Sequence, residues 1–535
     1  MPPYPAARTP ACGAEHQAFD ADAIVETLAA LERTGGLSAA VRLLASQALS
    51  PDRLTTIAVS LYRSGANAVP FVIATKLVEG GVESLVLRAL VAHLAVRLGQ
   101  PAAAGSIIQF AQRCRNADGS ERDTVRALLD PLLPIDLVEA FRAGNLALIR
   151  SYTPLWGALD PETLERLAPP PAGYVPNFAR FQNPALRLPQ RDFPAIPADA
   201  LHRTRKVVFA IRHRWVPDRP SSREHDMPSR YSSAIGNYGW SPIRHDLRSF
   251  NDAAIVTEDY QAISALCRES GADLLILDEF LPRWGTGAAG EIIRALRRDR
   301  PSLKILSIYF DPWNPQSWDE MEAAAAYLDG AWSQIVTPVW QRPAFRHKAF
   351  LFPFPLGGID AAPRSREPGF RFAGGVEYTN WDRALWLAAI SATELPLDIA
   401  VSAHRDDDLT PIESFRVYLQ RVCGAEAAIN FARRSNGLRT STARIFEVLA
   451  GGGLLVQERS DDLDFYLSAG EHYLRFETLT DLFDIAELIR SEPGFVNGIR
   501  HAGAAFFRAH YADDRLFAYL DRFLFDRESV ASAAA

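Results

Sequence analysis

The segment TSTARIFEVLAGGGLLVQE, residues 440–458, constrains the fold of this chain more than any other stretch. Its middle is largely apolar, and the three glycines that follow stop a helix. The hydroxyls of Thr440, Ser441 and Thr442 are each able to cap the start of that helix. The next residues, LLV, form the compact apolar run that a parallel sheet buries. The segment therefore predicts a short helix followed at once by a buried strand.

Two charged residues share one face of this predicted helix. Arg444 and Glu447 lie three positions apart, so their side chains are neighbours on the helix surface. A basic group suits a phosphate, and a carboxylate suits a pair of sugar hydroxyls. The alternative is an ordinary exposed ion pair, which contributes little to stability. Spacing alone leaves both interpretations open.

Four sequence pieces extend from Phe370 to about Phe523 in a recognisable order. They are FRFAGGVEYTNWDRALWL, INFARRSNGLRTSTARIFEVLAGGGLLVQE, LDFYLSAGEHYLRFETLTDLFDIAELI and GIRHAGAAFFRAHYADDRLFAYLDRFL. This region resembles the C-terminal half of GT-B glycosyltransferases, in particular the spore-maturation (CgeB-like) group, a type of group 1 C-terminal domain. The resemblance implies two Rossmann-like lobes, with a nucleotide-sugar donor bound by the second lobe and an acceptor by the first.

The resemblance also implies roles for single residues. Glu447 would accept hydrogen bonds from the donor ribose or sugar, and Arg444 would lie near the diphosphate. Glycines in the first turn of the second lobe would let backbone N–H groups approach a phosphate. Residues just before the helix would contact the diphosphate or its nearest sugar. The turn glycines are Gly374 and Gly375, and the residues before the helix are Asn436, Arg439 and Ser441.

Position 439 departs from the family pattern. Many retaining members carry a second glutamate eight residues before the helix glutamate, and this chain has Arg439 there. An arginine at that place is able to neutralise a leaving diphosphate, so the sequence leaves a retaining or an inverting outcome undecided. The nearby Arg433 and Arg434 are expected to be solvated charges.

The region after Lys206 alternates apolar runs with helical patterns. KVVFAIRH, GADLLILDEF and LKILSIYFD are expected strands of a parallel sheet with right-handed crossovers. The first strand precedes a long segment, residues 212–240, which is expected to be an irregular acceptor loop. His225 beside Asp226 is the leading candidate for the catalytic base, and Asp311 after the third run is the alternative. A solvated loop position is the competing interpretation for each of them.

The N-terminal part of the chain predicts a helical array. From Asp20 to about Tyr152 the sequence is rich in Ala and Leu, and Gly65 and Gly99 lie 34 residues apart in matching contexts. That period is typical of tetratricopeptide-like repeats, which stack helix pairs into a groove for a peptide or protein partner. Helices that only dimerise or cap the enzyme are the alternative. A proline-rich, semi-rigid connector follows.

Composition narrows the class of protein. A formal charge of -7 over 535 residues argues against a nucleic-acid surface, which demands a basic excess. The four cysteines are scattered, which argues against a zinc knuckle or a disulfide framework and suits a reducing compartment. We expect a cytoplasmic protein because neither a secretion signal nor a transmembrane run is evident. The acidic run at residues 404–410 is interpreted as a helix cap or solvated loop, so no metal or other cofactor is expected.

The sequence thus predicts an α/β protein of GT-B architecture preceded by an all-α, tetratricopeptide-like domain. The expected activity is sugar transfer from a nucleotide-sugar donor to a protein or glycan acceptor that the helical domain recruits. The main alternative is a non-catalytic interaction protein on a degenerate transferase fold, and a nucleotide-sugar epimerase is a weaker one. The expected parts are a tail (1–17), the helical domain (18–155), a linker (156–204), an acceptor-side lobe (205–345) and a donor-side lobe (346–527).

Overall fold

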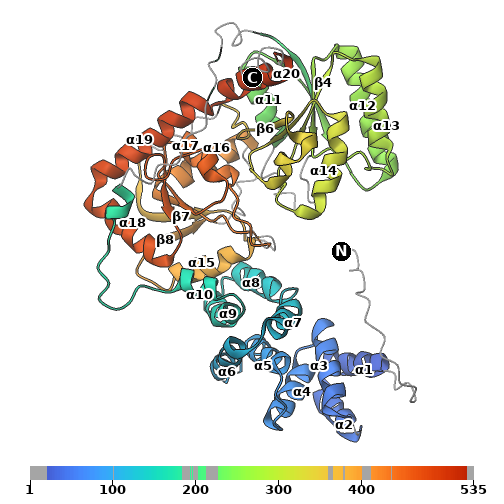
Figure 1. Ribbon diagram of the computed structural model, residues 1–535, viewed down its shortest axis with the longest axis vertical. Coiled ribbons are helices and arrows are strands. Elements are labelled where there is room, and N and C mark those ends of the chain that lie inside the picture. The colour runs from blue at the N-terminus through green and yellow to red at the C-terminus, as the bar shows by residue number, and fades with distance from the viewer. Residues whose placement is uncertain are drawn as a thin grey trace. The chain divides into compact units, whose positions relative to one another are not determined.

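The computed structural model describes most of the chain and divides it into two compact units. The units are Met1–Glu165 and Arg166–Ala535. Figure 1 colours the chain from blue in the first unit to red at the end of the second. The described residues are 21–47, 49–100, 102–182, 193, 196, 203–212, 227–358, 365–376, 380–400, 411–434 and 436–526.

The first unit is helical throughout its described residues. The glycines that set the 34-residue spacing both follow helices and have positive φ, 88° at Gly65 and 61° at Gly99. Each therefore ends a helix in a conformation that other residues adopt at a cost. The helices are α1 (Ala21–Arg33), α2 (Leu37–Ser46), α3 (Pro51–Arg63), α4 (Ala68–Glu79), α5 (Leu85–Arg97), α6 (Ala103–Asn116), α7 (Gly119–Leu129), α8 (Leu133–Arg142) and α9 (Leu146–Leu159), and α10 (Pro161–Leu167) continues into the second unit.

A buried polar cluster joins four of these helices. His93 of α5 lies between Tyr62 of α3, whose hydroxyl is 2.5 Å from Nδ1, and Asp136 of α8, whose Oδ2 is 2.8 Å from Nε2. Asp136 Oδ2 also accepts a hydrogen bond of 3.2 Å from Tyr152 of α9 and pairs with Arg97 at 3.1 Å. His93 is fully buried, and this burial lowers its pKa. A neutral imidazole with two hydrogen-bond partners fits the arrangement.

The first lobe of the second unit is a six-stranded parallel sheet in the order β2-β1-β3-β4-β5-β6. Apolar residues fill its interior strands, and every residue of β3 is buried. The helices on its faces include the long pair α12 and α13 (Figure 1). The elements are β1 (Lys206–Arg212), α11 (Met227–Asn237), β2 (Ser241–Leu247), α12 (Ala253–Ser270), β3 (Leu274–Asp278), α13 (Ala288–Asp299), β4 (Lys304–Ile308), α14 (Trp318–Ala324), β5 (Gly330–Ser333) and β6 (Ala349–Leu351).

The segment between residues 212 and 240 differs from its prediction as an irregular loop. Helix α11 occupies residues 227–237, and its Tyr231, Ala234 and Ile235 are buried in the core of the lobe. The edge strand β2 that follows was not predicted either. Its burial pattern is mostly exposed or intermediate, because an edge strand beside β1 needs no continuous apolar run.

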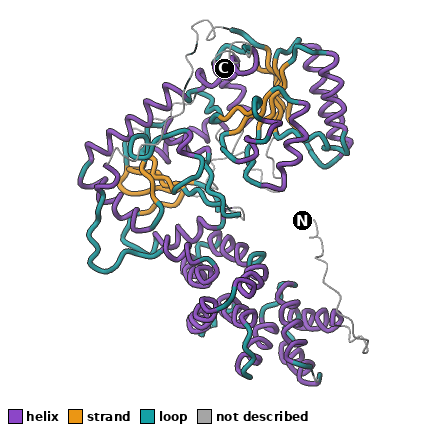
Figure 2. The backbone as a smooth tube through the Cα atoms, in the orientation of Figure 1, coloured by secondary structure: helices purple, strands orange, loops and turns teal. Residues whose placement is uncertain are grey.

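The second lobe is a five-stranded parallel sheet in the order β11-β10-β9-β7-β8. Figure 2 shows the two sheets as separate groups of strands, each flanked by helices. Segment 440–458 forms the predicted helix and buried strand, α17 and β10. The elements are β7 (Glu367–Ala373), α15 (Asp382–Ile390), β8 (Leu397–Ala400), α16 (Pro411–Cys423), β9 (Ala425–Asn430), α17 (Ala443–Ala450), β10 (Leu455–Glu458), β11 (Leu474–Phe476), α18 (Leu479–Ser491), α19 (Pro493–His510) and α20 (Asp513–Phe525).

The last helix, α20, returns to the first lobe. Phe517 packs against Trp240 with ring centroids 5.4 Å apart, and Phe523 packs against Phe350 at 5.2 Å. A Cβ added to Gly330 of β5 would lie 2.9 Å from Phe523, so that strand and α20 are in close contact. One apolar core therefore runs through both lobes.

The described part of the proline-rich connector packs on α18. Tyr174 donates a hydrogen bond of 2.7 Å to Asp484, and Arg180 pairs with Asp481 and Asp484 at 2.6 Å each. Aromatic and charged side chains thus hold the connector to the second lobe. In the parts of the chain described above, no helix combines the length and apolarity needed to cross a membrane. The expected domain boundaries remain predictions.

Candidate active site

Helix α17 places Arg444 and Glu447 at the carboxyl edge of the second sheet. Glu447 is only 5% exposed, so the pair is not the exposed ion pair of the alternative interpretation. A third residue, Tyr418 of α16, joins them: its hydroxyl donates to Glu447 Oε2 and accepts from Arg444 Nε, both at 3.1 Å. Burial raises the pKa of Tyr418, so the phenol stays neutral and able to donate.

Arg444 is fixed from three further sides. Its Nη1 donates to Asn430 at the end of β9 at 3.0 Å, and its guanidinium lies 5.5 Å from the ring centroid of Phe372. A Cβ added to Gly374 would lie 2.3 Å from Arg444 Nη2, and the φ of Gly374 is 154°. The glycine turn therefore makes room for this arginine. Gly375 follows, and its carbonyl accepts a hydrogen bond of 3.1 Å from Arg383.

The first lobe contributes a residue that the sequence did not single out. Arg230, in the first turns of α11, is 6% exposed, and its Nη1 lies 3.9 Å from Glu447 Oε1. It lies over the ring of Phe415 at 3.9 Å and donates to the carbonyl of Pro355 at 3.0 Å. Among the described residues, its Nε has no hydrogen-bond partner. The sequence did not indicate that Arg230 belongs to this site, because 217 positions separate it from Glu447.

The three hydroxyls expected to cap α17 are used elsewhere. The helix begins at Ala443, and the Thr442 side chain makes no capping bond but accepts from Asn430 Nδ2 at 3.0 Å. Thr440 accepts from Arg434 at 2.9 Å. The single O–H of Ser441 lies within hydrogen-bond distance of two acceptors, Asp462 at 2.8 Å and the carbonyl of Gln334 at 3.3 Å.

Ser441 therefore lies at a junction between the lobes. It is fully buried, and its partner Asp462 also accepts from the backbone of Val336 in the first lobe at 3.2 Å. Burial raises the pKa of Asp462, although hydrogen bonds from Ser460 and Ser441 oppose that shift. A buried hydroxyl with these partners holds the lobes together, a role that sequence spacing did not suggest.

The loop before α17 carries the other residues expected near the donor. Arg434 is buried, not solvated as expected, and also donates to Asn380 at 2.8 Å. Asn436 is exposed, and its side chain donates to the carbonyl of Trp313 in the first lobe at 3.0 Å. Arg439 forms an isolated β-bridge with Arg433, which is also largely buried. The bridge therefore folds the loop before α17 back on itself, and its side chains bond to Asn380 in the second lobe and Trp313 in the first.

The acceptor-side candidates fall in two places. Asp311 lines a cleft of about 280 Å³ at the carboxyl edge of the first sheet, together with Glu279, Tyr309 and Trp313. Glu279 directly follows β3 and has a φ of 42°, which is rare for a residue other than glycine. His225 and Asp226 lie outside the described residues, and so does the acidic run at 404–410.

The site therefore brings some predicted residues together and separates others. Gly374, Arg444 and Glu447 share one location, whereas Ser441 faces the lobe junction and Asn436 faces the loop at Trp313. Tyr418, Asn430 and Arg230 complete the first group. Over the described residues, no three His, Cys, Asp or Glu side chains group as metal ligands do. The expectation of a metal-independent enzyme stays a prediction.

Comparison with known families bears on this lobe. Residues 362–521 match the family described as glycosyl transferase-like. The second lobe is glycosyltransferase-like. Together with the two parallel sheets and the helical region, the match confirms the expected GT-B type of α/β architecture. It supports sugar transfer in general, while the spore-maturation subgroup and the tetratricopeptide-like repeats remain predictions.

Other comparisons are weak. No curated protein matches the chain. A structure of HepE from Anabaena with UDP and glucose matches at 10% identity and a TM-score of 0.38, covering 60% of this chain and 99% of that chain. Sucrose-phosphate synthase from Thermosynechococcus elongatus matches at 11% and 0.39, covering 61% and 100%. A mutant O-GlcNAc transferase from Thermobaculum terrenum matches at 13% and 0.34, covering 96% and 100%.

Proposed function

We propose that the protein is a glycosyltransferase that moves a sugar from a nucleotide-sugar donor to a hydroxyl of a protein or glycan acceptor. The observation that carries the proposal is the hydrogen-bonded group of Arg444, Tyr418 and the buried Glu447 in the glycosyltransferase-like lobe. Burying the carboxylate of Glu447 and partly burying Arg444 and Tyr418 costs free energy unless these groups are paired or serve a ligand. Their place at the carboxyl ends of parallel strands favours a ligand.

The donor would bind between α17 and the glycine turn. Glu447 Oε2 accepts a hydrogen bond from the Tyr418 hydroxyl. Its Oε1 lies 3.9 Å from Arg230 Nη1, which is beyond hydrogen-bond distance. Oε1 is therefore able to accept hydrogen bonds from sugar or ribose hydroxyls. Arg444 beside Gly374 suits the diphosphate. The buried Nε of Arg230 offers one more donor to a bound anion.

The acceptor would bind at the cleft of the first lobe. A general base must lie within hydrogen-bond reach of the acceptor hydroxyl, and Asp311 and Glu279 both line that cleft. The base takes the hydroxyl proton, the acceptor oxygen bonds to the sugar carbon, and the nucleoside diphosphate leaves. Arginines would neutralise the leaving group, so we propose no metal requirement. His225 and Asp226 remain alternatives for the base.

The helical unit would recruit the acceptor, and the protein would act in the cytoplasm. A non-catalytic interaction protein that uses the helices alone is the competing function. The two differ in one respect that is simple to measure: only the transferase needs a nucleotide-sugar. Donor binding therefore separates them.

The test is thermal unfolding with UDP-, GDP-, dTDP- and CMP-sugars. A donor at 100 times its dissociation constant should stabilise the protein by about 2.7 kcal/mol. We expect one donor class to raise the Tm of the wild type but not of Glu447→Ala. Glu487→Ala, which removes a carboxylate on α18 that pairs with Arg490, serves as the control and should respond like the wild type.

Donor stabilisation that survives in Glu447→Ala would contradict the assigned site. A wild type that responds to no donor would contradict the transferase function and favour the interaction protein. Product formation with the responding donor, and its loss in Asp311→Asn but not in Asp319→Asn, would test the acceptor side. Asp319 pairs with Arg342 and does not itself line the cleft.

A further inference from the structure

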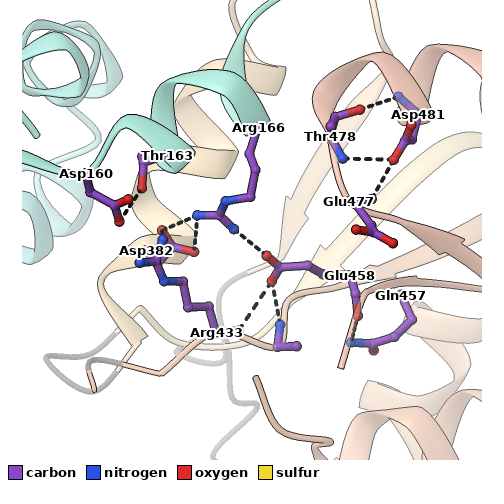
Figure 3. A network of polar contacts seen from close by, with 11 residues as sticks. Asp160, Thr163, Arg166, Asp382, Arg433, Gln457, Glu458, Glu477, Thr478 and Asp481 are labelled. Carbon is purple, nitrogen blue, oxygen red and sulfur yellow. Dashed lines mark hydrogen bonds and ion pairs between the residues drawn. The ribbon is translucent and has the colours of Figure 1, made fainter. Parts of the chain in front are cut away.

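A buried arginine outside the donor group lies between two buried carboxylates. Arg166, near the end of α10 and within the second unit, donates through Nη1 to Glu458 Oε1 at 2.6 Å and through Nη2 to Asp382 Oδ1 at 3.2 Å (Figure 3). Its guanidinium also lies 5.6 Å from the ring centroid of Trp386. All three charged side chains are at most 6% exposed, so they interact with little screening by solvent.

The other carboxylate oxygen of Glu458 accepts hydrogen bonds from two backbone amides. Glu458 is the last residue of β10, and its Oε2 accepts from the amides of Ala432 at 2.7 Å and Arg433 at 3.3 Å (Figure 3). These amides open the loop between β9 and α17. The same loop carries Arg434, Asn436 and Arg439 and leads into Arg444. One carboxylate thus connects Arg166 to the start of the loop beside the proposed donor site.

The charges around Glu458 explain why this connection needs an arginine. Burial raises the pKa of Glu458, and the neighbouring carboxylate of Asp382 raises it further, whereas Arg166 and Arg439 oppose both effects. Arg433 also faces Asp382, at 3.9 Å. A carboxylate accepts two amide hydrogen bonds more strongly than a neutral acid does. Loss of Arg166 would therefore weaken the contact with the loop through protonation.

We infer that Arg166 is a positioning residue for the donor site, because it holds Glu458 against the amides of Ala432 and Arg433 and so fixes the loop that leads to Arg444. The effect on donor binding rests on the proposed function, but the effect on the loop does not. Arg166 itself touches neither the proposed donor nor the acceptor.

The test compares Arg166→Met with the wild type and with Arg180→Met. Arg180 pairs with Asp481 and Asp484 on α18, so its loss removes an arginine–carboxylate contact elsewhere in the same lobe. Hydrogen exchange of the Ala432 and Arg433 amides reports on the loop, and donor titration reports on the site. In Arg166→Met at pH 6.5 we expect at least tenfold faster exchange and at least tenfold weaker donor binding, with neither change in Arg180→Met.

Two further readouts separate positioning from a general loss of stability. Raising the pH should move the protection factors of the Ala432 and Arg433 amides in Arg166→Met toward the wild-type values, because a higher pH favours the ionised form of Glu458. Arg166→Met combined with Asp382→Asn should also recover, since the repelling carboxylate is gone. Arg166→Lys keeps one positive charge and should lie between wild type and Arg166→Met, which provides a second variant where the methionine protein does not fold.

Exchange at Ala432 and Arg433 that is unchanged in both Arg166 variants would overturn the inference. A loss of protection at these two amides that neither high pH nor Asp382→Asn reverses would also overturn it. Donor binding that is as tight in Arg166→Met as in the wild type would overturn the link to the donor site. It would leave the proposed function intact. Faster, pH-dependent exchange in a protein that binds no donor would support the positioning of the loop and remove the proposed function.

Discussion

The helical unit and the second lobe each bury a carboxylate among polar partners, Asp136 in the first and Glu458 in the second. Among the described residues, the Asp136 carboxylate contacts side chains only, and all of them belong to helices. Glu458 meets one side chain, Arg166, and two amides of a loop. A carboxylate shared by helices fixes how those helices pack, whereas one that accepts loop amides fixes the edge of a sheet where ligands bind.

The pKa shifts in the two clusters also have opposite directions. Burial lowers the pKa of His93, so the unfolded chain binds a proton there first as the pH falls. Burial and Asp382 raise the pKa of Glu458, so the unfolded chain releases its proton first as the pH rises. Acidification should therefore weaken the cluster at His93.

The largest effect is expected from Asp136→Ala. His93, Tyr152 and Arg97 would lose a shared acceptor in a buried place, and breaking such a cluster costs about 3–5 kcal/mol. Chemical denaturation with segment-resolved hydrogen exchange measures the loss in the helical unit. Glu139→Ala, an exposed position on the same helix, is the control. Equal effects of the two variants would show that the cluster contributes no special stability.

A smaller effect on stability is expected from Glu458→Gln, with a larger effect on ligand binding. The amide keeps the shape but leaves Arg166 with an incomplete partner, at a cost of about 1–3 kcal/mol. Exchange at Ala432 should become faster and donor binding weaker, neither of which Asp136→Ala should cause. Glu477→Gln, partly exposed and paired with Arg459, is the matched control. Unchanged loop exchange in Glu458→Gln would remove the distinction between the two clusters.

The pH dependence of His93 should be smaller still. Stability of the helical unit should be retained above pH 6.5 and lost as the pH falls below it toward the lowered pKa of the folded state. The measurement is segment-resolved exchange or Tm between pH 7.5 and 5.5, with His93→Gln expected to flatten the profile. A profile that stays equally steep in His93→Gln would assign the acid sensitivity to another group.

The smallest effect should come from an exposed pair in the helical unit. Lys76 and Glu79 on α4 lie 2.9 Å apart with side chains 75% and 59% exposed. Lys76→Ala should change the free energy of unfolding by at most about 0.5 kcal/mol, because solvent screens such pairs. Denaturation in low and high salt checks this. A change comparable to that of Asp136→Ala would mean that burial is not what separates strong from weak charge contacts here.

The sequence predicted the features that short-range pattern controls. Apolar runs located β1, β3, β4 and β10, and the glycine run ended α17 at Ala450 as expected. Edge strand β2 and helix α11 were missed because neither carries the continuous apolar run of a central strand. Arg444 and Glu447 were identified from spacing and resemblance. Tyr418, Arg230 and Arg166 were not, since their partners lie far away along the chain, 292 positions in the case of Arg166 and Glu458.

Polar residues before α17 show a second limit of prediction. Ser441 has the composition of a cap or ligand contact, but only the fold shows that Asp462 and a first-lobe carbonyl use its hydroxyl. Arg434 has the charge of a solvated residue, but the loop buries it against Thr440 and Asn380. Residue type defines which bonds are available, and tertiary structure decides which of them form.

The return of α20 to the first lobe has a consequence for synthesis on the ribosome. The strands of that lobe emerge early, yet Trp240 and Phe350 obtain part of their packing from Phe517 and Phe523. Domains generally fold as they emerge, N-terminal part first. Here the earlier lobe must wait for the translation of the whole later lobe, and its apolar surface stays uncovered meanwhile. The nascent chain is therefore most dependent on chaperones just before α20 appears.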